Sequence, residues 1–353
     1  MVPGVTGTLD DTAVAALTSW VRAQGLGETV SDVVPLAGGS QNVVVRLRID
    51  GRRLVLRRPP PHPRPNSDRT MQREIAVLST LADSSVPHPR IVAACEDLDI
   101  LGVVFYLMEE VDGFNPGNEI TAAYVDDPAM RHQVGLNYAA DVARLGQAPW
   151  QGSPLEHWKR PGSFLDRQVP QWRSSVAGYR AQDGYAHDSL PGVDDLCDWL
   201  AARQPSDYVP GIVHGDIHLN NTMLRRAVPE VAAFVDWEMC TIGDPLLDLG
   251  WMLVCWPVDP NPLGSADYLA ELGGLAARGE LLAAYEAAGG RRTEDLDWYL
   301  ALACLKLGVV IEGTWVRYLA GRASREAGER LHESAVTLMG LGGAVAAGDN
   351  PFR

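Results

Sequence analysis

The residues best suited to chemistry lie in one short stretch, residues 213–223, which reads Val-His-Gly-Asp-Ile-His-Leu-Asn-Asn-Thr-Met. It contains Asp216 and, five positions later, Asn221; a second carboxylate, Asp236, follows the apolar run 231–235. A carboxylate can accept or orient the proton of an attacking hydroxyl group. An amide oxygen and a second carboxylate can hold Mg²⁺, which prefers a few hard oxygen ligands and water. The spacing therefore predicts a phosphoryl-transfer site with Asp216 as the base and Asn221 and Asp236 as metal ligands.

Two histidines, His214 and His218, flank Asp216 and suggest an alternative, a His/Asp/His metal site. No further His or Cys is spaced to complete such a site, so we prefer the phosphoryl-transfer interpretation. Downstream, Asp248 lies in an apolar helical pattern. Because a buried carboxylate must be hydrogen-bonded, we expect Asp248 to brace the backbone of the 214–221 loop.

A phosphate-binding element is predicted upstream, where two β-rich runs flank a polar tip in the stretch 33–47. Small residues allow backbone N–H groups to approach a polyphosphate closely, and a serine adds a hydroxyl group. An ordinary hairpin turn is the alternative, since Gly-Gly turns are common. The predicted nucleotide contacts at this tip are Gly39, Ser40, Gln41 and Asn42.

A cation for the α- and β-phosphates is expected on the next strand, residues 54–60. Strand alternation places Val55 and Arg57 on one face, and Arg57 is the candidate. A helix predicted over 68–81 carries Glu74 close to its apolar stripe, from where it could pair with Arg57, because a buried arginine needs a carboxylate. The alternative is that both are solvated surface charges.

The composition changes after the strand that ends near Gly113, from β-rich to helical. Residues 109–113 therefore make a natural hinge, whose backbone offers the donor and the acceptor that an adenine edge needs. A β-rich part followed by a helical part predicts an α+β fold with two lobes, an N-lobe over 1–112 and a C-lobe over 113–353. Helical patterns are expected over 10–24, 130–145, 193–202, 246–255, 269–287, 296–319 and 330–341.

The bulk composition excludes several classes of protein. A formal net charge of −15 argues against nucleic-acid binding, which needs a basic face. Five scattered cysteines form no CxxC pair or Cys/His cluster, which is typical of a reduced, cytoplasmic protein without a zinc site. No secretory signal is apparent. The apolar run 249–258 is about half of the ~20 residues that span a bilayer. These observations predict a cytoplasmic protein with no nucleic-acid or membrane partner. We expect it to be a monomer or a homodimer.

These motifs, taken together, resemble the aminoglycoside phosphotransferase/choline kinase-like family, which has a protein-kinase-like fold. The resemblance rests on the patterns His214-Gly215-Asp216-x-His218-x-x-Asn221, Val235-Asp236-Trp237-Glu238 and Gly243-Asp244-Pro245-x-x-Asp248-Leu249. It extends from about residue 33 to about residue 320. The segments 56–60 and 160–172 are similar to one branch, which includes kinase-like domains fused to acyl-CoA dehydrogenases and their free-standing bacterial relatives.

The resemblance implies phosphorylation of a small-molecule hydroxyl group that depends on ATP and Mg²⁺. Residue by residue, it implies Asp216 as catalytic base, Asn221 and Asp236 as Mg²⁺ ligands, Arg57 with its partner Glu74 at the phosphates, and the backbones of Glu109 and Val111 at the adenine. Two residues depart from the family pattern. Arg57 stands where Lys is usual, and an arginine differs from lysine in shape. Gly146 stands where relatives often carry His.

The acceptor is left open by the resemblance. The fused branch implies a hydroxyacyl-CoA or a similar metabolite, which we favour, whereas the family name implies an aminoglycoside or another antibiotic. Basic and aromatic residues facing a cleft would favour an anionic or acyl acceptor, and a carboxylate-rich rim would favour a polycation; alternatively these residues pack a helix. The residues in question are Lys159, Arg160, Arg167, Trp172 and Arg173. A non-catalytic pseudokinase that binds nucleotide is the hypothesis from another class, and Arg57 is its only support.

Overall fold

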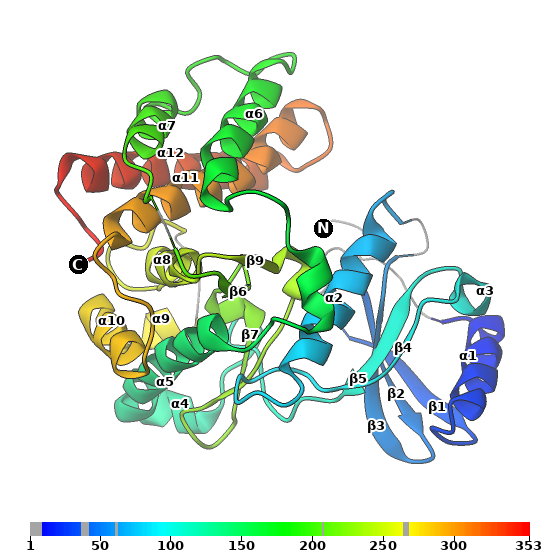
Figure 1. Cartoon of the computed structure of the whole chain (residues 1–353). Coiled ribbons are helices and arrows are strands. Elements are labelled where there is room, and N and C mark those ends of the chain that lie inside the picture. Colours follow the sequence, from blue (N-terminus) through cyan, green and yellow to red (C-terminus); the bar gives the residue numbers. More distant parts are fainter. Residues whose placement is uncertain (1–8, 37–41, 61–62, 207, 264–267) are drawn as a thin grey trace. The chain divides into compact units, whose positions relative to one another are not determined.

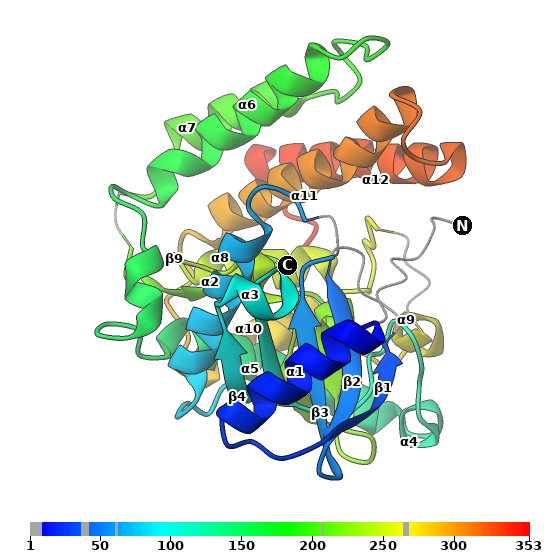
Figure 2. The ribbon, with the colours of Figure 1, turned by 90° about the vertical axis from the view of Figure 1, so that its right-hand side faces the viewer.

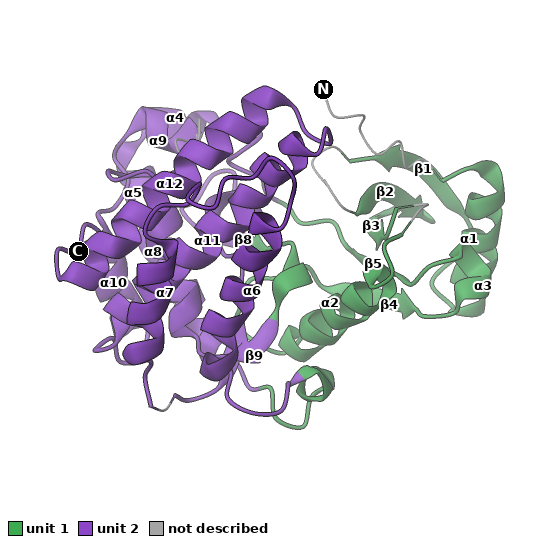
Figure 3. Ribbon diagram, turned by 90° about the horizontal axis from the view of Figure 1, so that it is seen from above, with its two compact units in different colours: residues 1–112, 150–158, 233–240 green, residues 113–149, 159–232, 241–353 purple. Residues whose placement is uncertain are grey.

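The computed structural model describes residues 9–36, 42–60, 63–206, 208–263 and 268–353. The chain forms two compact units (Figure 3). Unit 1 comprises Met1–Asp112, Trp150–Trp158 and Ala233–Cys240, and unit 2 comprises Gly113–Pro149, Lys159–Ala232 and Thr241–Arg353. Asp236, although it follows the 214–221 loop in sequence, therefore belongs to the same unit as Arg57 and Glu74.

Unit 1 is built around an antiparallel five-stranded sheet with the strand order β1-β2-β3-β5-β4 (Figure 1). Its strands are β1 (Val30–Pro35), β2 (Val43–Ile49), β3 (Arg52–Arg58), β4 (Ile91–Cys95) and β5 (Phe105–Glu109). Its helices are α1 (Asp11–Ala23), α2 (Ser67–Leu81) and α3 (Leu98–Leu101), with the short 3₁₀ turns η1 (Pro154–Trp158) and η4 (Trp237–Met239).

Helix α1 covers one face of this sheet (Figure 2). Leu17 and Trp20 of α1 share a buried core with alternate strand residues such as Val45 and Leu56, and the Trp20 ring meets Phe105 edge to face at 5.0 Å. Because successive strand residues point to opposite faces, the residues between these core positions point away from α1. Arg57 of β3 and its cross-strand neighbour Tyr106 of β5 occupy that second face.

Helix α2 is fixed by contacts with other parts of unit 1. Near its start, Asp68 accepts a hydrogen bond of 2.9 Å from the Val104 N–H. The segment Trp150–Trp158 packs along it: Thr80 donates to the Ser153 hydroxyl at 3.0 Å, and the Arg69 guanidinium lies 5.3 Å from the centroid of the Trp158 ring. These contacts hold the helix that carries Glu74.

Unit 2 is mostly helical. Its helices are α4 (Ala122–Asp126), α5 (Pro128–Gln147), α6 (Gln168–Arg180), α7 (Val193–Ala202), α8 (Leu246–Cys255), α9 (Tyr268–Leu272), α10 (Arg278–Ala287), α11 (Leu296–Leu319) and α12 (Arg325–Ala347), with the 3₁₀ turns η2 (Leu165–Arg167) and η3 (Leu219–Asn221). Its short strands are β6 (Gly211–Val213), β7 (Thr222–Leu224) and β9 (Thr241–Gly243); β8 (Val231–Phe234) leads from this unit into unit 1. The predicted α+β class is confirmed.

Helix α11 is the centre of unit 2, because it packs against α12, α8, α6 and α7 (Figures 1 and 2). By length and composition this helix could cross a membrane, and the prediction above considered only residues 249–258. However, 67% of its most apolar window is buried inside the protein. Core helices of soluble proteins share this pattern. The predicted bounds of α7, α8 and α11 agree with the structure.

Two of the predicted helices differ from those observed by more than two residues at an end. The helix expected over 269–287 is two helices, α9 and α10, because Gly273 and Gly274 adopt positive φ angles of 66° and 74° that end the first one. The last helix extends beyond the expected 330–341 at both ends. Ser324 caps its start by accepting a hydrogen bond from the Ala327 N–H.

Candidate functional site

The backbone of the 214–221 loop of unit 2 is hydrogen-bonded to Asp248 in the first turn of α8. The Asp248 carboxylate accepts hydrogen bonds from the N–H of His214 at 2.6 Å and of Gly215 at 2.9 Å. Gly215 has φ = +85°, a conformation that favours glycine. Asp248 is 2% exposed. The predicted bracing of the loop by Asp248 is confirmed.

Asp216 and Asn221 are brought together within this loop. The Asn221 side-chain nitrogen donates to the Asp216 backbone carbonyl and to its carboxylate, each at 2.9 Å. The Asn221 N–H in turn donates to the His218 carbonyl at 2.9 Å, which closes the turn η3. Since the amide nitrogen of Asn221 is engaged with Asp216, its amide oxygen is the atom suited to a cation, as the predicted role requires.

Asp216 is a half-buried carboxylate whose pKa is lowered to about 2. Burial alone would raise this pKa, but the close contact with His218 and the nearby His214 and Lys306 outweigh it. The His218 Nε2 atom lies 3.6 Å from the Asp216 carboxylate. Asp216 is therefore ionised at neutral pH and can accept the hydrogen bond of a hydroxyl group, acting first by orienting it.

Lys306 of α11 is a residue of this loop region that sequence reasoning missed. Its ammonium group donates to the Gly215 carbonyl and lies 4.1 Å from the centroid of the Trp251 ring. It is 4% exposed, and burial lowers its pKa. The available signal was a single cation in the otherwise apolar stretch 300–311.

Arg57 forms the centre of the corresponding cluster in unit 1. Its guanidinium donates to Glu74 from Nε at 2.7 Å and from Nη2 at 3.1 Å, and Nη2 also donates to Asp236 at 2.7 Å. Glu74 is 1% exposed and also accepts from the Tyr106 hydroxyl at 3.0 Å. Burial opposes the charge on Arg57, but Glu74 and Asp236 keep its pKa well above the usual value. The predicted Arg57–Glu74 pair is confirmed.

Asp236 has an unusual backbone conformation, with φ = +65°. Left-handed backbone at a non-glycine residue costs about 1–3 kcal/mol and persists only where the surroundings enforce it. Here the following turn is pinned on both sides: the Trp237 ring N–H donates to the Phe234 carbonyl at 3.0 Å, and Arg73 of α2 donates to the Glu238 carbonyl. Two adjacent residues of helix α2 therefore fix the Asp236 segment. Arg73 contacts it directly, and Glu74 holds Arg57, which in turn contacts Asp236.

The remaining predicted nucleotide contacts are only partly described. Asn42 directly precedes β2, and Gly39, Ser40 and Gln41 lie outside the described residues. Glu109 ends β5, where its N–H donates to the Arg90 carbonyl at 2.9 Å and its side chain pairs with Arg52. A base contact at Glu109 would therefore use its carbonyl. Val111 follows the strand, and its adenine contact stays a prediction.

The metal-site hypotheses can be compared within the described residues. In the described ranges, no group of three or more His, Cys, Asp or Glu side chains could hold a metal ion. The His/Asp/His alternative at residues 214–218 is therefore not supported. A site of one amide and one carboxylate needs no such group. Asn221 belongs to unit 2 and Asp236 to unit 1, so their joint Mg²⁺ site stays a prediction.

Three of the five basic and aromatic residues proposed to report on the acceptor are buried or contact other groups of unit 2. Arg167 donates to the carbonyls of Pro161 and Ser163 at 2.9 and 2.8 Å. Arg173 of α6 pairs with Asp198 of α7, and Trp172 is buried. These contacts agree with the alternative that the three residues pack a helix.

Gly146, the second departure from the family pattern, now has a physical explanation. A Cβ atom at this position would lie 2.5 Å from Cβ of Pro245, and a Cβ on Gly211 would also meet the Gly146 carbonyl. Any side chain at residue 146 would push apart the end of α5 and the segment that leads into α8.

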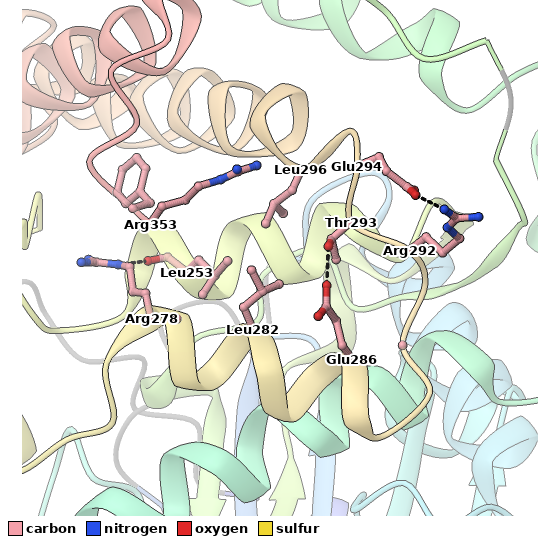
Figure 4. A pocket seen from close by; sticks show the side chains of 12 residues that line it. Leu253, Arg278, Leu282, Glu286, Arg292, Thr293, Glu294, Leu296 and Arg353 are labelled. Carbon is pink, nitrogen blue, oxygen red and sulfur yellow. Dashed lines mark hydrogen bonds and ion pairs between the residues drawn. The ribbon is translucent and has the colours of Figure 1, made fainter.

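A pocket of about 750 Å³ lies elsewhere in unit 2 (Figure 4). Figure 4 shows its wall of α10 side chains, including Leu282 and Glu286, facing Leu296 and Arg353. Arg278 at its edge donates to backbone carbonyls of the segment 253–260. None of the residues that line this pocket is a predicted site residue, so the chemistry is assigned to the loop and not to the pocket.

Curated relatives of this chain carry the name of a larger enzyme. The chain is 28% identical over 296 residues to acyl-CoA dehydrogenase family member 10 of Mus musculus, covering 81% of this chain and 26% of that protein. It is 28% identical over 304 residues to acyl-CoA dehydrogenase family member 11 of Homo sapiens, covering 85% and 38%. The chain thus spans well under half of the length of these relatives.

Solved structures confirm the predicted protein-kinase-like fold. A crystal structure from Ralstonia eutropha JMP134, named after the aminoglycoside phosphotransferases, superposes with a TM-score of 0.75 at 27% identity and covers 95% of this chain and 98% of that one. The GDP complex of aminoglycoside 2'-phosphotransferase-IIIa shares the fold at a TM-score of 0.63 and 17% identity, covering 92% and 98%. The model of the phosphotransferase enzyme family matches residues 32–298, the larger part of the sequence. This chain belongs to the phosphotransferase enzyme family.

Proposed function

We propose that this protein transfers the γ-phosphoryl group of ATP to a hydroxyl group of a small molecule and requires Mg²⁺. Membership of the phosphotransferase family supports the reaction type. The observation that carries the proposal is the Asp216–Asn221 pair, with an ionised carboxylate and an amide that turns its nitrogen toward it and keeps its oxygen for a cation. Phosphoryl transfer needs this kind of positioning more than it needs covalent chemistry.

In the proposed reaction, the acceptor hydroxyl donates a hydrogen bond to the Asp216 carboxylate, which aims its oxygen at the γ-phosphorus. A new O–P bond forms as the bond between the γ-phosphorus and the ADP oxygen breaks, and the hydroxyl proton passes to Asp216. Because the pKa of Asp216 is about 2, the proton moves late, when the hydroxyl has become acidic. Arg57, held by Glu74, supplies positive charge near the phosphates.

The metal would be held by the Asn221 amide oxygen and by the Asp236 carboxylate, a set of hard oxygen donors that fits Mg²⁺. When bound, Mg²⁺ would neutralise charge on the phosphate oxygens. The Asp236 side chain is 39% exposed, and the oxygen that pairs with Arg57 is one of two. The predicted hairpin contacts and the carbonyl of Glu109 would bind the rest of ATP.

For the acceptor, we propose a hydroxyacyl-CoA or a similar hydroxylated metabolite. The names of the curated relatives, which refer to acyl-CoA chemistry, support it. The packing role of Arg167, Trp172 and Arg173 removes one argument for an acyl acceptor, so the relatives carry this part of the proposal. An aminoglycoside acceptor is the second candidate, because the 27% identical crystal structure is named after enzymes that use one.

The experiment is a screen for ATP consumption with hydroxyacyl-CoAs, sugars, amino alcohols and aminoglycosides, each with wild type and with the Asp216→Asn variant. We expect consumption that depends on one acceptor class and on Mg²⁺ and that is lost in the variant. ATP binding without turnover of any acceptor would instead support the pseudokinase hypothesis. Equal consumption by both proteins would refute the role of Asp216.

We further propose a cytoplasmic location, a monomeric or homodimeric state, and no nucleic-acid or membrane partner.

A further inference from the structure

Both backbone polar groups of Gly215, in the 214–221 loop, are hydrogen-bonded to side chains of other elements. Its N–H donates to Asp248 at 2.9 Å, and its carbonyl accepts from the ammonium group of Lys306. Asp248 belongs to α8 and Lys306 to the middle of α11, so two core helices of unit 2 hold consecutive peptide groups. The carbonyl that Lys306 contacts is part of the peptide bond that joins Gly215 to Asp216.

Lys306 carries its charge in a buried position. It is 4% exposed and lies among apolar neighbours, and burying an ammonium group costs free energy unless the group is hydrogen-bonded and near opposite charge. The compensation comes from the Gly215 carbonyl, from the face of the Trp251 ring 4.1 Å away, and from the nearby carboxylates of Asp216 and Asp248. All of these partners are at, or directly behind, the loop.

We propose that Lys306 is a positioning residue for Asp216. By fixing the direction of the Gly215 carbonyl, it fixes the peptide plane from which the Asp216 side chain projects, while Asp248 fixes the preceding peptide. Gly215 needs such support, because its φ of +85° is open to glycine but is not enforced by a side chain. This inference rests on the proposed function for its kinetic consequence, but its structural part can be tested without any turnover.

The first test is hydrogen exchange of the whole chain, followed by mass spectrometry of a peptide that covers residues 211–220. In Lys306→Met, which keeps most of the side-chain length but removes the donor and the charge, we expect the loop amides to exchange at least about tenfold faster, because a charge-assisted hydrogen bond is lost. Met339→Ala is the matched control, since Met339 of α12 packs beside Gly308 on α11. It should lower the melting temperature without a selective change in the loop.

The second test is kinetic and uses an acceptor identified for the wild type. Lys306→Met should lower kcat about ten- to a hundredfold, with the KM for ATP within about twofold and an unchanged number of ATP-binding sites per chain. Lys306→Gln, which keeps an N–H donor, should recover part of kcat. If Lys306 had a merely structural role, both variants would have fewer ATP-binding sites per chain, and Lys306→Gln and Lys306→Met would have the same kcat.

The outcomes distinguish the two proposals. Faster loop exchange in Lys306→Met, with a wild type that phosphorylates no acceptor, would support the positioning role and count against the proposed function. Loop exchange equal to that of the wild type, or equal effects of Lys306→Met and Met339→Ala on the loop, would overturn the positioning role even if the protein is an active kinase.

Discussion

The Arg57→Lys substitution tests how unit 1 positions Asp236. Arg57 joins Glu74 and Asp236 through three N–H···O contacts of 2.7, 3.1 and 2.7 Å, made by two different nitrogen atoms. Lysine keeps the charge but has one nitrogen and a shorter reach, so it cannot reproduce both contacts. We expect the pair with the buried Glu74 to persist and the contact with Asp236 to weaken.

A hydrogen bond to a charged group contributes about 1.5–3 kcal/mol, and about 1.4 kcal/mol corresponds to a factor of ten. Losing the contact between residue 57 and Asp236 should therefore lower kcat/KM for ATP about ten- to a hundredfold. Removing the charge with Arg57→Met is a harsher change, because Glu74 is 1% exposed and would be left buried without a cation. That variant should lose about 3–5 kcal/mol of stability.

The assay measures kcat/KM for ATP at saturating acceptor, together with the melting temperature. Arg58→Lys is the matched control: it lies on the same strand, and its side chain points to the opposite face of the sheet. It should stay within about twofold of wild type in kcat/KM. Wild-type activity and stability in Arg57→Lys would refute the idea that the two nitrogen atoms of the Arg57 guanidinium position Asp236.

Three further predictions follow from single contacts. Asp236→Asn should raise the Mg²⁺ concentration for half-maximal activity at least tenfold, because a ligand charge is lost; an unchanged Mg²⁺ titration would contradict its role as a ligand. Gly146→Ala should destabilise the protein by about 1–3 kcal/mol in denaturant unfolding, since the new methyl group would meet Pro245 at 2.5 Å; an unchanged midpoint would contradict this packing argument. Burial raises the pKa of Asp248 from 3.8 to about 6, so its carboxylate is less favourable in the folded than in the unfolded chain. The contribution of Asp248 to the free energy of unfolding should therefore be highest below pH 4, fall by up to about 3 kcal/mol as the pH rises to about 6, and stay constant above that. The Asp248→Asn variant should lack this slope.

Local pattern was enough to predict much of the fold and the main chemical groups. The bounds of α7 and α11 follow from the helical pattern of apolar residues, which depends on neighbours in sequence. The Arg57–Glu74 pair could be predicted because a buried cation on a strand requires a carboxylate from the adjacent helix. The bracing role of Asp248 followed from the same requirement for a buried carboxylate.

The rest depends on contacts between distant segments. The bond between Arg57 and Asp236 joins residues 179 positions apart, and that between Lys306 and Gly215 joins residues 91 positions apart. No periodicity encodes which helix faces which loop, so an isolated lysine in an apolar helix could not be assigned to a loop in advance. The packing of Trp150–Trp158 against α2 is of the same kind, because it follows from how the chain returns to unit 1.

The most direct test of the central claim is the transfer of labelled phosphate from γ-labelled ATP to an acceptor, compared between wild type and Asp216→Asn at equal folded concentration. Transfer by the wild type should require both Mg²⁺ and the acceptor, and it should fall at least a thousandfold in the variant while ATP binding is retained. Transfer by the variant at a rate close to that of the wild type would contradict the assignment of Asp216, and with it the reaction proposed for this loop.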